Sequence, residues 1–401
     1  MPYDAIVVGA RCAGSPTAML LARRGHRVLL VDRATFPSDT ISTHILHPPG
    51  VAAMARWGLL DRLLATRCPP IDTYAFDFGP RTITGAPGTA TNPLSYCPRR
   101  TVLDKILLDG AAEAGAEVRE GFTVTELLTD DDGTVTGVRG HGRAGGTVTE
   151  RARVVIGADG LHSLVAGTVR PEQYWEKPSL IATYYSYFSD LPMAGRFELY
   201  ARPERGFCAA PTHDGLTIVV AGWPQAQFEA NRTDIEGNVL ATVGLAPEFA
   251  ARLRSATRVG RFVGMSVPNF FRTPYGPGWA LVGDAGYTKD PITAQGISDA
   301  FREAELCATA LDTHFSGTRP YADAMAGYQS ARDDHVLPIY EFTTQLATLE
   351  PPSPEFRQLL DAMDGNQEAM DGFARVNSGM TSPADFFSDA NVSRILSAAA
   401  V

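Results

Sequence analysis

The sequence lacks the features that mark membrane, secreted and nucleic-acid-binding proteins. No apolar run approaches the roughly 20 residues that cross a bilayer, and the opening MPYDAIVV has no basic segment of the kind that begins a signal peptide. Positive charge is scarce, since 35 Lys and Arg residues stand against 45 Asp and Glu, for a net charge of −10. We therefore expect neither a nucleic-acid partner nor a membrane partner.

Cysteine is also sparse, and its spacing shows no pairing. The cysteines are Cys12, Cys68, Cys97, Cys208 and Cys307. This odd, scattered set without a CxxC pair is typical of a reduced protein, and we expect a cytoplasmic location. His44 and His47 in HILH have no evident carboxylate partner, so no metal site is expected.

Two glycine-rich stretches compete as nucleotide-binding loops. GHGRAG, residues 140–145, matches the fingerprint G-x-G-x-x-G at every position, whereas GARCAG, residues 9–14, has Arg11 in place of the middle glycine. GHGRAG follows the hairpin signal Asp132-Gly133 and lies between two expected strands, with no helix after it. We expect it to be only a turn, because a bare motif match carries little weight.

GARCAG has the surroundings of a dinucleotide-binding loop. A buried strand is expected over residues 3–8, a helix from Ala13, and a second buried strand that ends at Asp32. Gly9 permits a sharp turn and Gly14 close packing of helix on strand, while the first-turn N–H groups can bind a pyrophosphate. Asp32 lies near the roughly 20-residue spacing of an acid that binds a ribose hydroxyl.

Arg11 is the unusual residue of this loop, because its side chain stands where backbone should approach phosphate. Either the chain bends away from the cofactor here, or the guanidinium itself pairs with the pyrophosphate. We count Arg11 among the expected cofactor-binding residues, together with Arg33, which directly follows Asp32.

Two later segments narrow the choice of nucleotide. VVIGADG, residues 154–160, is an apolar strand that runs into a glycine-flanked acid. WALVGDAGYTKDPITAQGISDAF, residues 279–301, is a strand followed by a Gly-Asp turn and a helix. With GARCAG, these segments resemble in order and spacing the glycine-rich, DG and GD motifs of the group A flavoprotein monooxygenases, the para-hydroxybenzoate hydroxylase family. The resemblance covers residues 3–311, and the geranylgeranyl reductases share the same architecture.

The resemblance implies roles for individual residues. Asp32 would bind the adenosine ribose and Asp284 a ribityl hydroxyl of FAD, while Asp159 would lie near the pyrophosphate and the approach of a nicotinamide. Arg100 would contact the cofactor, and His44 would lie near the flavin. The complete expected set is Gly9, Arg11, Ala13, Gly14, Asp32, Arg33, His44, Arg100, Asp159, Gly283, Asp284, Pro291, Gly296 and Ile297.

The helix expected over residues 295–311 would point its N-terminus at the flavin pyrimidine, where the helix dipole favours the negative charge of reduced flavin. The sequence departs from the family pattern around this helix. AQG stands in place of GQG, GDAGY in place of GDAAH, and Ala166 occupies the position of an expected arginine. These departures leave nicotinamide handling and the substrate class open.

The expected fold class is α/β, with a Rossmann-like βαβ FAD-binding domain, an inserted antiparallel β-sheet substrate domain and a C-terminal helical region. The FAD-binding domain would comprise residues 1–71, 95–175 and 265–325, the substrate domain residues 72–94 and 176–264, and the helical region residues 326–401. In the helical region, Pro338 predicts a kink or stop, and Ser353 caps a helix that begins at Pro354. This region would cover the pocket or form a subunit contact.

The strands of the substrate domain carry aromatic residues suited to a pocket. ATYYSYF, RFELYA and LTIVVAGW are its clearest strands. The candidates for substrate contact are Tyr185, Tyr187, Phe197 and Trp223. Each is also compatible with a place in the core, where an aromatic stripe is more often found.

We expect an FAD-dependent monooxygenase that uses NAD(P)H and O2 on a small to medium-sized organic molecule, aromatic compounds included. In the cycle that the resemblance implies, reduced flavin captures O2 as a C4a-hydroperoxide. The alternatives are a reductase of C=C bonds, similar to the geranylgeranyl reductases, and a non-catalytic FAD-binding sensor. Halogenation is not expected, because the W-x-W-x-I-P signature of flavin halogenases is absent. A homodimer and a separate flavin reductase both stay open as partners.

Overall fold

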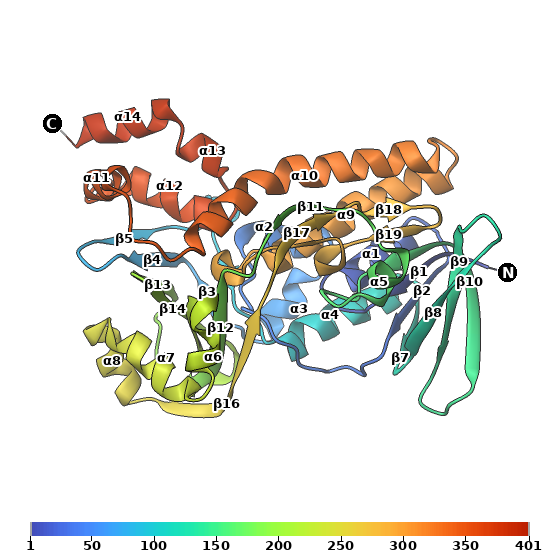
Figure 1. Ribbon diagram of the computed structural model, residues 1–401, viewed down its shortest axis with the longest axis horizontal. Coiled ribbons are helices and arrows are strands. Elements are labelled where there is room, and N and C mark those ends of the chain that lie inside the picture. Colours follow the sequence, from blue (N-terminus) through green and yellow to red (C-terminus); the bar gives the residue numbers. More distant parts are fainter. Residues whose placement is uncertain (1, 400–401) are drawn as a thin grey trace.

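The computed structural model describes residues 2–399 and has two sheet-based bodies, with helices along their upper side (Figure 1). The expected mixed α/β class is confirmed, and both bodies are assembled from segments that lie far apart in the sequence.

The first body is an open, mainly parallel sheet at the right of Figure 1. β1 pairs in parallel with β2 and with β10, and β10 pairs in parallel with β19. The apolar runs of β1 and β2 are buried on both faces, as a central parallel strand requires. The strands are β1 (Tyr3–Val8), β2 (Val28–Asp32), β7 (Glu117–Glu120), β8 (Thr123–Thr129), β9 (Val135–His141), β10 (Thr147–Gly157), β18 (Tyr275–Gly276) and β19 (Trp279–Leu281).

Helices cover the two faces of this sheet unequally. Ala5 and Val7 pack with α1, α4 and α9 into one core, whereas Ile6 and Val8 face a second core with β8 and α5. The helices of this body are α1 (Gly14–Arg23), α2 (Pro48–Arg56), α3 (Leu60–Ala65), α4 (Arg100–Glu113), α5 (Leu164–Val169) and α9 (Gly296–Phe315). α1 follows β1 after a short turn, so it begins at the carboxyl end of that strand.

The second body is a mostly antiparallel sheet at the left of Figure 1, in the order β16-β12-β15-β14-β13-β4-β5. Its strands are β4 (Thr73–Asp77), β5 (Thr82–Gly85), β12 (Ile181–Ser189), β13 (Arg196–Arg202), β14 (Arg205–Pro211), β15 (Thr217–Pro224) and β16 (Thr257–Ser266). β4 joins by parallel pairing with β13, so the segment before α4 belongs to this sheet. One face packs against α6 (Phe228–Asn231), α7 (Ile235–Gly244) and α8 (Pro247–Arg254).

Two small sheets connect the bodies. β11 (Gln173–Lys177), β17 (Asn269–Arg272) and β20 (Tyr287–Thr288) form one, and β3 (Pro70–Ile71) and β6 (Ser95–Tyr96) form the other. Short 3-10 turns complete the chain: η1 (His213–Gly215), η2 (Gln225–Gln227), η3 (Gly283–Ala285) and η4 (Pro291–Thr293).

α10 (Tyr321–Leu346) packs along α9 on the first body, and its C-terminal part reaches the second sheet (Figure 1). The helices α11 (Pro354–Met363), α12 (Gln367–Asn377), α13 (Pro383–Phe386) and α14 (Asp389–Ala398) lie over the other face of the second sheet, where they share a core with Phe76 and Phe197. Ser353 caps α11 as expected, because its Oγ accepts from the N–H of Phe356 at 3.1 Å.

Of the kink or stop expected at Pro338, the stop was wrong. α10 runs through this proline without a break, and it begins at Tyr321 rather than after Met325. Val336, Ile339 and Tyr340 pack on either side of the proline against Phe271. This packing holds the helix together, although Pro338 has no N–H to donate to the preceding turn.

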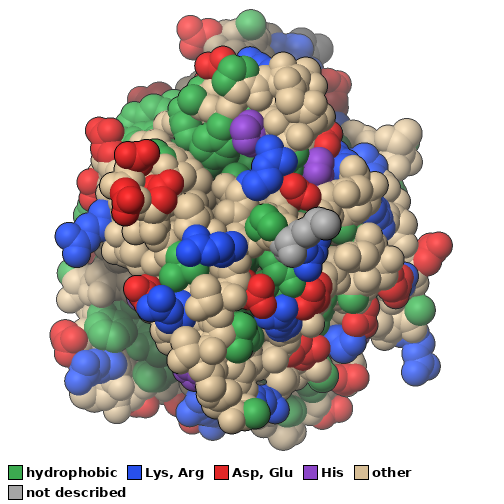
Figure 2. All heavy atoms as spheres, turned by 90° about the vertical axis from the view of Figure 1, so that its right-hand side faces the viewer, with side chains coloured by type: hydrophobic (Ala, Val, Ile, Leu, Met, Phe, Trp, Pro, Cys, Tyr) green, Lys and Arg blue, Asp and Glu red, His purple; other side chains and the backbone are tan. Residues whose placement is uncertain are grey.

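The end of the molecule that carries β8 and β9 is shown as a surface in Figure 2, where acidic and basic side chains are interspersed. Within residues 2–399, no helix combines the length and apolar character needed to cross a membrane.

Candidate functional site

The turn after β1 is packed too tightly for any residue but glycine at two positions. Gly9 has a φ of +103°, and a Cβ there would stand 2.3 Å from the carbonyl oxygen of Ala158. A Cβ on Gly14 would stand 1.7 Å from the carbonyl oxygen of Gly9. The N-terminus of α1 is therefore held at the carboxyl edge of the sheet, where its free N–H groups suit a pyrophosphate.

Asp32 ends β2, and two backbone groups fix its carboxylate. Oδ2 accepts from the N–H of Ala10 and Oδ1 from the N–H of Ala34, each at 2.7 Å. A carboxylate can accept about four hydrogen bonds, so both oxygens keep capacity for ribose hydroxyls. The neighbouring Arg33 is exposed. Asp32 thus fits the ribose role that the resemblance implies.

The three motifs meet at this turn. A Cβ on Gly9 would lie 3.0 Å from the Cα of Asp159, in the DG loop. A Cβ on Gly283, in the GD loop, would lie 2.8 Å from the Cβ of Ala13. Segments that are far apart in the sequence therefore form one cradle, and glycine is needed where they touch.

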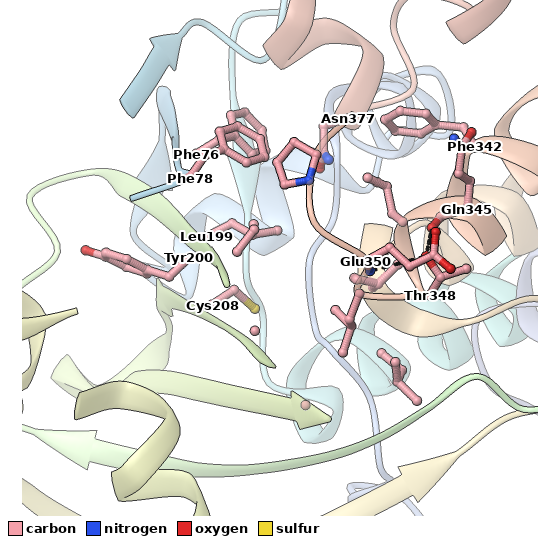
Figure 3. A pocket seen from close by; sticks show the side chains of 18 of the residues that line it. Phe76, Phe78, Leu199, Tyr200, Cys208, Phe342, Gln345, Thr348, Glu350 and Asn377 are labelled. Carbon is pink, nitrogen blue, oxygen red and sulfur yellow. Dashed lines mark hydrogen bonds between the residues drawn. The ribbon is translucent and has the colours of Figure 1, made fainter. Parts of the chain in front are cut away.

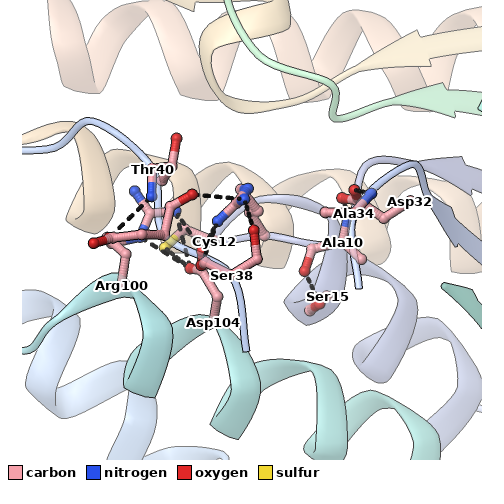
Figure 4. Close-up of polar contacts among 11 residues, drawn as sticks. Ala10, Cys12, Ser15, Asp32, Ala34, Ser38, Thr40, Arg100 and Asp104 are labelled. Atoms are coloured by element: carbon pink, nitrogen blue, oxygen red, sulfur yellow. Dashed lines mark hydrogen bonds and ion pairs between the residues drawn. The ribbon is translucent and has the colours of Figure 1, made fainter. Parts of the chain in front are cut away.

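Two arginines share one buried carboxylate beside this cradle (Figure 4). Arg100, at the start of α4, donates to Asp104 Oδ1 at 3.0 Å, and Arg11 donates to Asp104 Oδ2 at 2.5 Å. Arg11 also donates to the backbone oxygen and the hydroxyl of Ser38. Asp104 is fully buried, so it holds both guanidinium groups in place. Asp104 offsets only one of these two guanidinium charges, and a guanidinium can pair with a pyrophosphate.

Asp159 has a structural task as well as a place beside the cradle. Its Oδ1 accepts from the Ser163 hydroxyl at 2.5 Å, and its Oδ2 accepts from the N–H of Leu164 at 2.7 Å. These bonds cap α5, the helix that carries Ala166. Burial raises the pKa of Asp159, and the hydrogen bond from Ser163 opposes that rise.

Asp284 lies in the η3 turn, accessible from the cradle. The surrounding protein limits its hydration and raises the pKa of its carboxyl, while the charge of Arg100 acts in the opposite direction. A hydrogen bond to α9 fixes the η3 turn, because the buried Glu303 of that helix accepts from the N–H of Gly283 at 3.0 Å. Burial raises the pKa of Glu303 to about 8.

The chain then reaches α9 through the η4 turn, which begins at Pro291. Ala294 adopts the left-handed conformation with a φ of +55°, where the family pattern has glycine. Gly296 opens α9, and Ile297 is buried in the core beneath it. α9 therefore begins beside the η4 turn, and its first-turn N–H groups are suited to negative charge, as the resemblance implies for this helix.

His44 is fully buried and also left-handed, with a φ of +66°. Its Nδ1 donates to the carbonyl of Ser42 at 2.6 Å, so its Nε2 accepts from the Tyr187 hydroxyl at 2.7 Å. Burial lowers the pKa of His44 to about 4, which keeps the ring neutral. His47 bonds instead to Tyr74 and to the carbonyl of Thr293.

A cavity of about 1520 Å³ lies between the second sheet and the C-terminal helices (Figure 3). Its sheet wall includes Phe76 and Phe197, and its helical wall includes Phe356 and Phe373. The cavity reaches the η4 turn, which links it to the cradle described above. The helical region thus covers a pocket, one of the two roles expected for it.

The four aromatic candidates separate in space. Phe197 lines the cavity. Tyr185 and Tyr187 pack edge-on around the His44 ring instead. Trp223 is fully buried on the opposite face of the sheet, stacked on Tyr184 and packed with α7 and α8. Side chains alternate along β15, so Ile218 and Val220 face the cavity and Trp223 faces away from it. Trp223 therefore does not line this cavity.

The fully matching stretch, residues 140–145, forms the turn between β9 and β10, which pair antiparallel. No helix follows it, and a Cβ on Gly142 would meet no atom within 4 Å. The expectation that this stretch is only a turn is confirmed.

Sequence reasoning missed two residues of the site. The spacing of four residues between Arg100 and Asp104 could have indicated an ion pair within a helix. The contact of Asp104 with Arg11 joins distant segments and could not be predicted from local sequence. Asn377 of the cavity wall gave no signal, because its helix lies far along the chain from the motifs.

The fold and the convergent motifs define an FAD-binding oxidoreductase. The chain matches the FAD binding domain family over residues 2–343, and it belongs to this family of group A flavoprotein monooxygenases.

Its relatives carry out varied chemistry. The chain is 26% identical to a menaquinone reductase of Mycolicibacterium smegmatis, over 86% of this chain and 84% of that protein. It is 26% identical to a rifampicin monooxygenase of Streptomyces venezuelae, over 89% of this chain and 74% of that protein. Among solved structures, the myxobacterial chondrochloren halogenase matches with a TM-score of 0.81 and 25% identity, over 99% of this chain and 96% of that chain.

Proposed function

We propose that this chain is an FAD-dependent monooxygenase. It takes two electrons from NAD(P)H, inserts one atom of O2 into an organic substrate and releases the other as water. The observation that carries the proposal is a wall shared by the two sites. Pro291, Ile292 and Ala294 belong to the turn between the GD loop and α9, and they also line the large cavity. A molecule in the cavity would therefore lie against the loop that holds the cofactor.

The residues of the cradle divide the work of holding FAD, whose bound form supplies the redox chemistry. Asp32 and Asp284 would bind hydroxyl groups of FAD, and the start of α1 would bind its pyrophosphate. The start of α9 would stabilise negative charge on the reduced cofactor. The apolar side chains of the cavity exclude water from the reacting atoms. Exclusion of water suppresses side reactions that would oxidise NAD(P)H without oxygenating the substrate.

The test is to mix the FAD-loaded protein with NADH or NADPH under nitrogen, with and without a candidate substrate. Rifampicin, a naphthoquinone and squalene are suitable first candidates. We expect the oxidised flavin band to bleach within seconds. After admission of labelled O2, we expect one labelled oxygen atom in the product for each donor oxidised. A band that persists for minutes with both donors would contradict direct reduction and favour a separate flavin reductase.

The second candidate is a reductase of C=C bonds, and the similarity to a menaquinone reductase over 86% of this chain favours a reductase of some kind. The two functions differ in their need for oxygen. Oxidation of NAD(P)H coupled to loss of the substrate double bond under nitrogen would select the reductase. Matched consumption of donor and O2 would select the monooxygenase.

A further inference from the structure

The cavity is large for a small substrate. Its volume of about 1520 Å³ exceeds the roughly 300–1,000 Å³ of pockets that hold drug-sized ligands. It runs from the η4 turn to the surface, where the turn after β4, the turn after β13 and the segment before α11 surround its mouth. A small molecule would leave most of this space to water, so the shape favours a long or polycyclic occupant.

The deep walls of the cavity are apolar. Phe76, Phe197 and Ile218 contribute from the sheet, and Leu360 and Phe373 contribute from the helices. Transfer of these surfaces from water to an apolar ligand stabilises binding by about 25 cal/mol for each Å². The occupant therefore presents hydrocarbon to most of the wall.

The charged residues of the lining leave no buried charge for an ionic ligand. None of those described is fully buried, and the cations nearest the apolar part are already paired. Arg81 bonds to Asp361, Lys177 to Glu341, and Arg202 to Asp77. A charged ligand group in the deep part would lose its hydration without gaining a partner, which is costly.

One buried amide interrupts the apolar wall. Asn377, the last residue of α12, is only 5% exposed, and its side chain lines the cavity (Figure 3). Within the described chain, no group hydrogen-bonds the Asn377 side-chain amide. Its backbone carbonyl accepts from Gln295 Nε2 at 2.6 Å, which fixes Asn377 beside the loop that precedes α9. The amide is open toward the cavity, so both its N–H and its C=O are available to a ligand group there.

We propose that the cavity binds a large, neutral and mainly apolar molecule that carries a hydroxyl or carbonyl group, and that Asn377 hydrogen-bonds this group. An amide both donates and accepts, so it serves either group, whereas it cannot neutralise a carboxylate or an amine. The bond anchors the molecule at the end of the cavity nearest the cofactor loop. Asn377 is thus a residue that determines specificity. The inference deepens the proposed function by naming its substrate class.

Three probes separate the contribution of apolar contact to binding from that of the polar end group. They share a pyrene body with a four-carbon chain and end in a methyl, a hydroxyl or a carboxylate group: 1-butylpyrene, 4-(1-pyrenyl)butanol and 4-(1-pyrenyl)butyrate. Their binding to the FAD-loaded protein, without electron donor, is followed by pyrene fluorescence. We expect the alcohol to bind most tightly and the carboxylate most weakly. Tighter binding of the carboxylate than of the alcohol, or no binding of any probe, would overturn the proposal.

Two variants locate the hydrogen bond. Asn377→Leu should weaken binding of the alcohol by roughly three- to tenfold and leave butylpyrene unchanged or tighter. The matched control is Gln345→Ala, which removes an exposed amide at the cavity wall and should leave all three probes unchanged. Asn377→Ala serves as a second variant, with FAD content and melting temperature as checks on folding. Equal losses for the alcohol and for butylpyrene would refute the hydrogen bond.

The proposal and the proposed function fail separately in these experiments. Probe binding needs neither NAD(P)H nor O2. If the alcohol binds as expected while no substrate is oxygenated, the substrate class stands and the monooxygenase assignment falls. If labelled oxygen enters a substrate whose affinity is the same in the wild type and in Asn377→Leu, the monooxygenase assignment stands and this inference falls.

Discussion

Two loops in this chain resemble the same glycine fingerprint but have different surroundings in the fold. Residues 9–14 follow a strand that is buried between two parallel neighbours, and a helix follows them. Residues 140–145 join two antiparallel strands at an exposed hairpin. In the first loop an added Cβ on Gly14 would overlap the backbone, whereas on Gly142 it would point into open space. The packing around a glycine, rather than the glycine itself, makes the nucleotide site.

The two loops also differ in the charges around them. The first loop meets the Asp32 carboxylate through Ala10, and it contains Arg11, which pairs with Asp104. In the second loop, Arg143 donates to the Thr35 hydroxyl at the surface. Of the two loops, only the first combines a helix N-terminus with a carboxylate held by backbone N–H groups, which together suit a dinucleotide.

The largest effect should come from placing valine in each loop. In Gly14→Val, the side chain would force α1 away from β1 and move its N–H groups off the pyrophosphate, so we expect the purified protein to lose its FAD. Gly142→Val should retain the FAD content of the wild type. The ratio of flavin to protein absorbance measures both. Flavin loss in Gly142→Val with retention in Gly14→Val would reverse the assignment.

The second effect concerns two carboxylates, Asp284 beside the first loop and Asp131 at the end of β9 that lies away from the second loop. Asp284→Ala should fold but bind FAD about tenfold or more weakly, because a hydrogen bond to a charged group contributes about 1.5–3 kcal/mol. Asp131→Ala is the matched control, since Asp131 is exposed in the β8–β9 turn. Titration of the apo-protein with FAD measures both affinities. Wild-type affinity in Asp284→Ala would show that the ribityl contact is assigned wrongly.

The sequence was sufficient for the elements whose signals are local. Buried apolar runs identify β1 and β2, the Asp132-Gly133 turn identifies the β8–β9 hairpin, and Ser353 before Pro354 identifies the start of α11. The motifs also indicated which loops would come together, because a parallel sheet collects the carboxyl ends of its strands at one edge.

The remaining features depend on tertiary packing. Pro338 is tolerated because Tyr340 and its neighbours pack against Phe271, a contact between segments far apart in the chain. The orientation of Trp223 follows from which face of the second sheet the C-terminal helices cover, and no local pattern encodes that choice. The cavity wall around Asn377 could not be predicted from the sequence either, because it forms between the C-terminal helices and strands that lie far away in the chain.

The smallest expected effect on FAD affinity tests the residue that makes the first loop imperfect. Arg11→Gly would give that loop the full fingerprint, and Arg143→Gly is the matched change in the second loop. The Arg11 guanidinium bonds to Asp104 and to Ser38, so its loss should destabilise the protein by about 1–2 kcal/mol. Arg100 still pairs with Asp104 and stays in place. We therefore expect Arg11→Gly to lower the melting temperature while FAD affinity stays within about threefold of the wild type. Arg143→Gly should change neither quantity, because its bond is exposed. A tenfold loss of FAD affinity in Arg11→Gly at an unchanged melting temperature would show instead that this guanidinium pairs directly with the pyrophosphate.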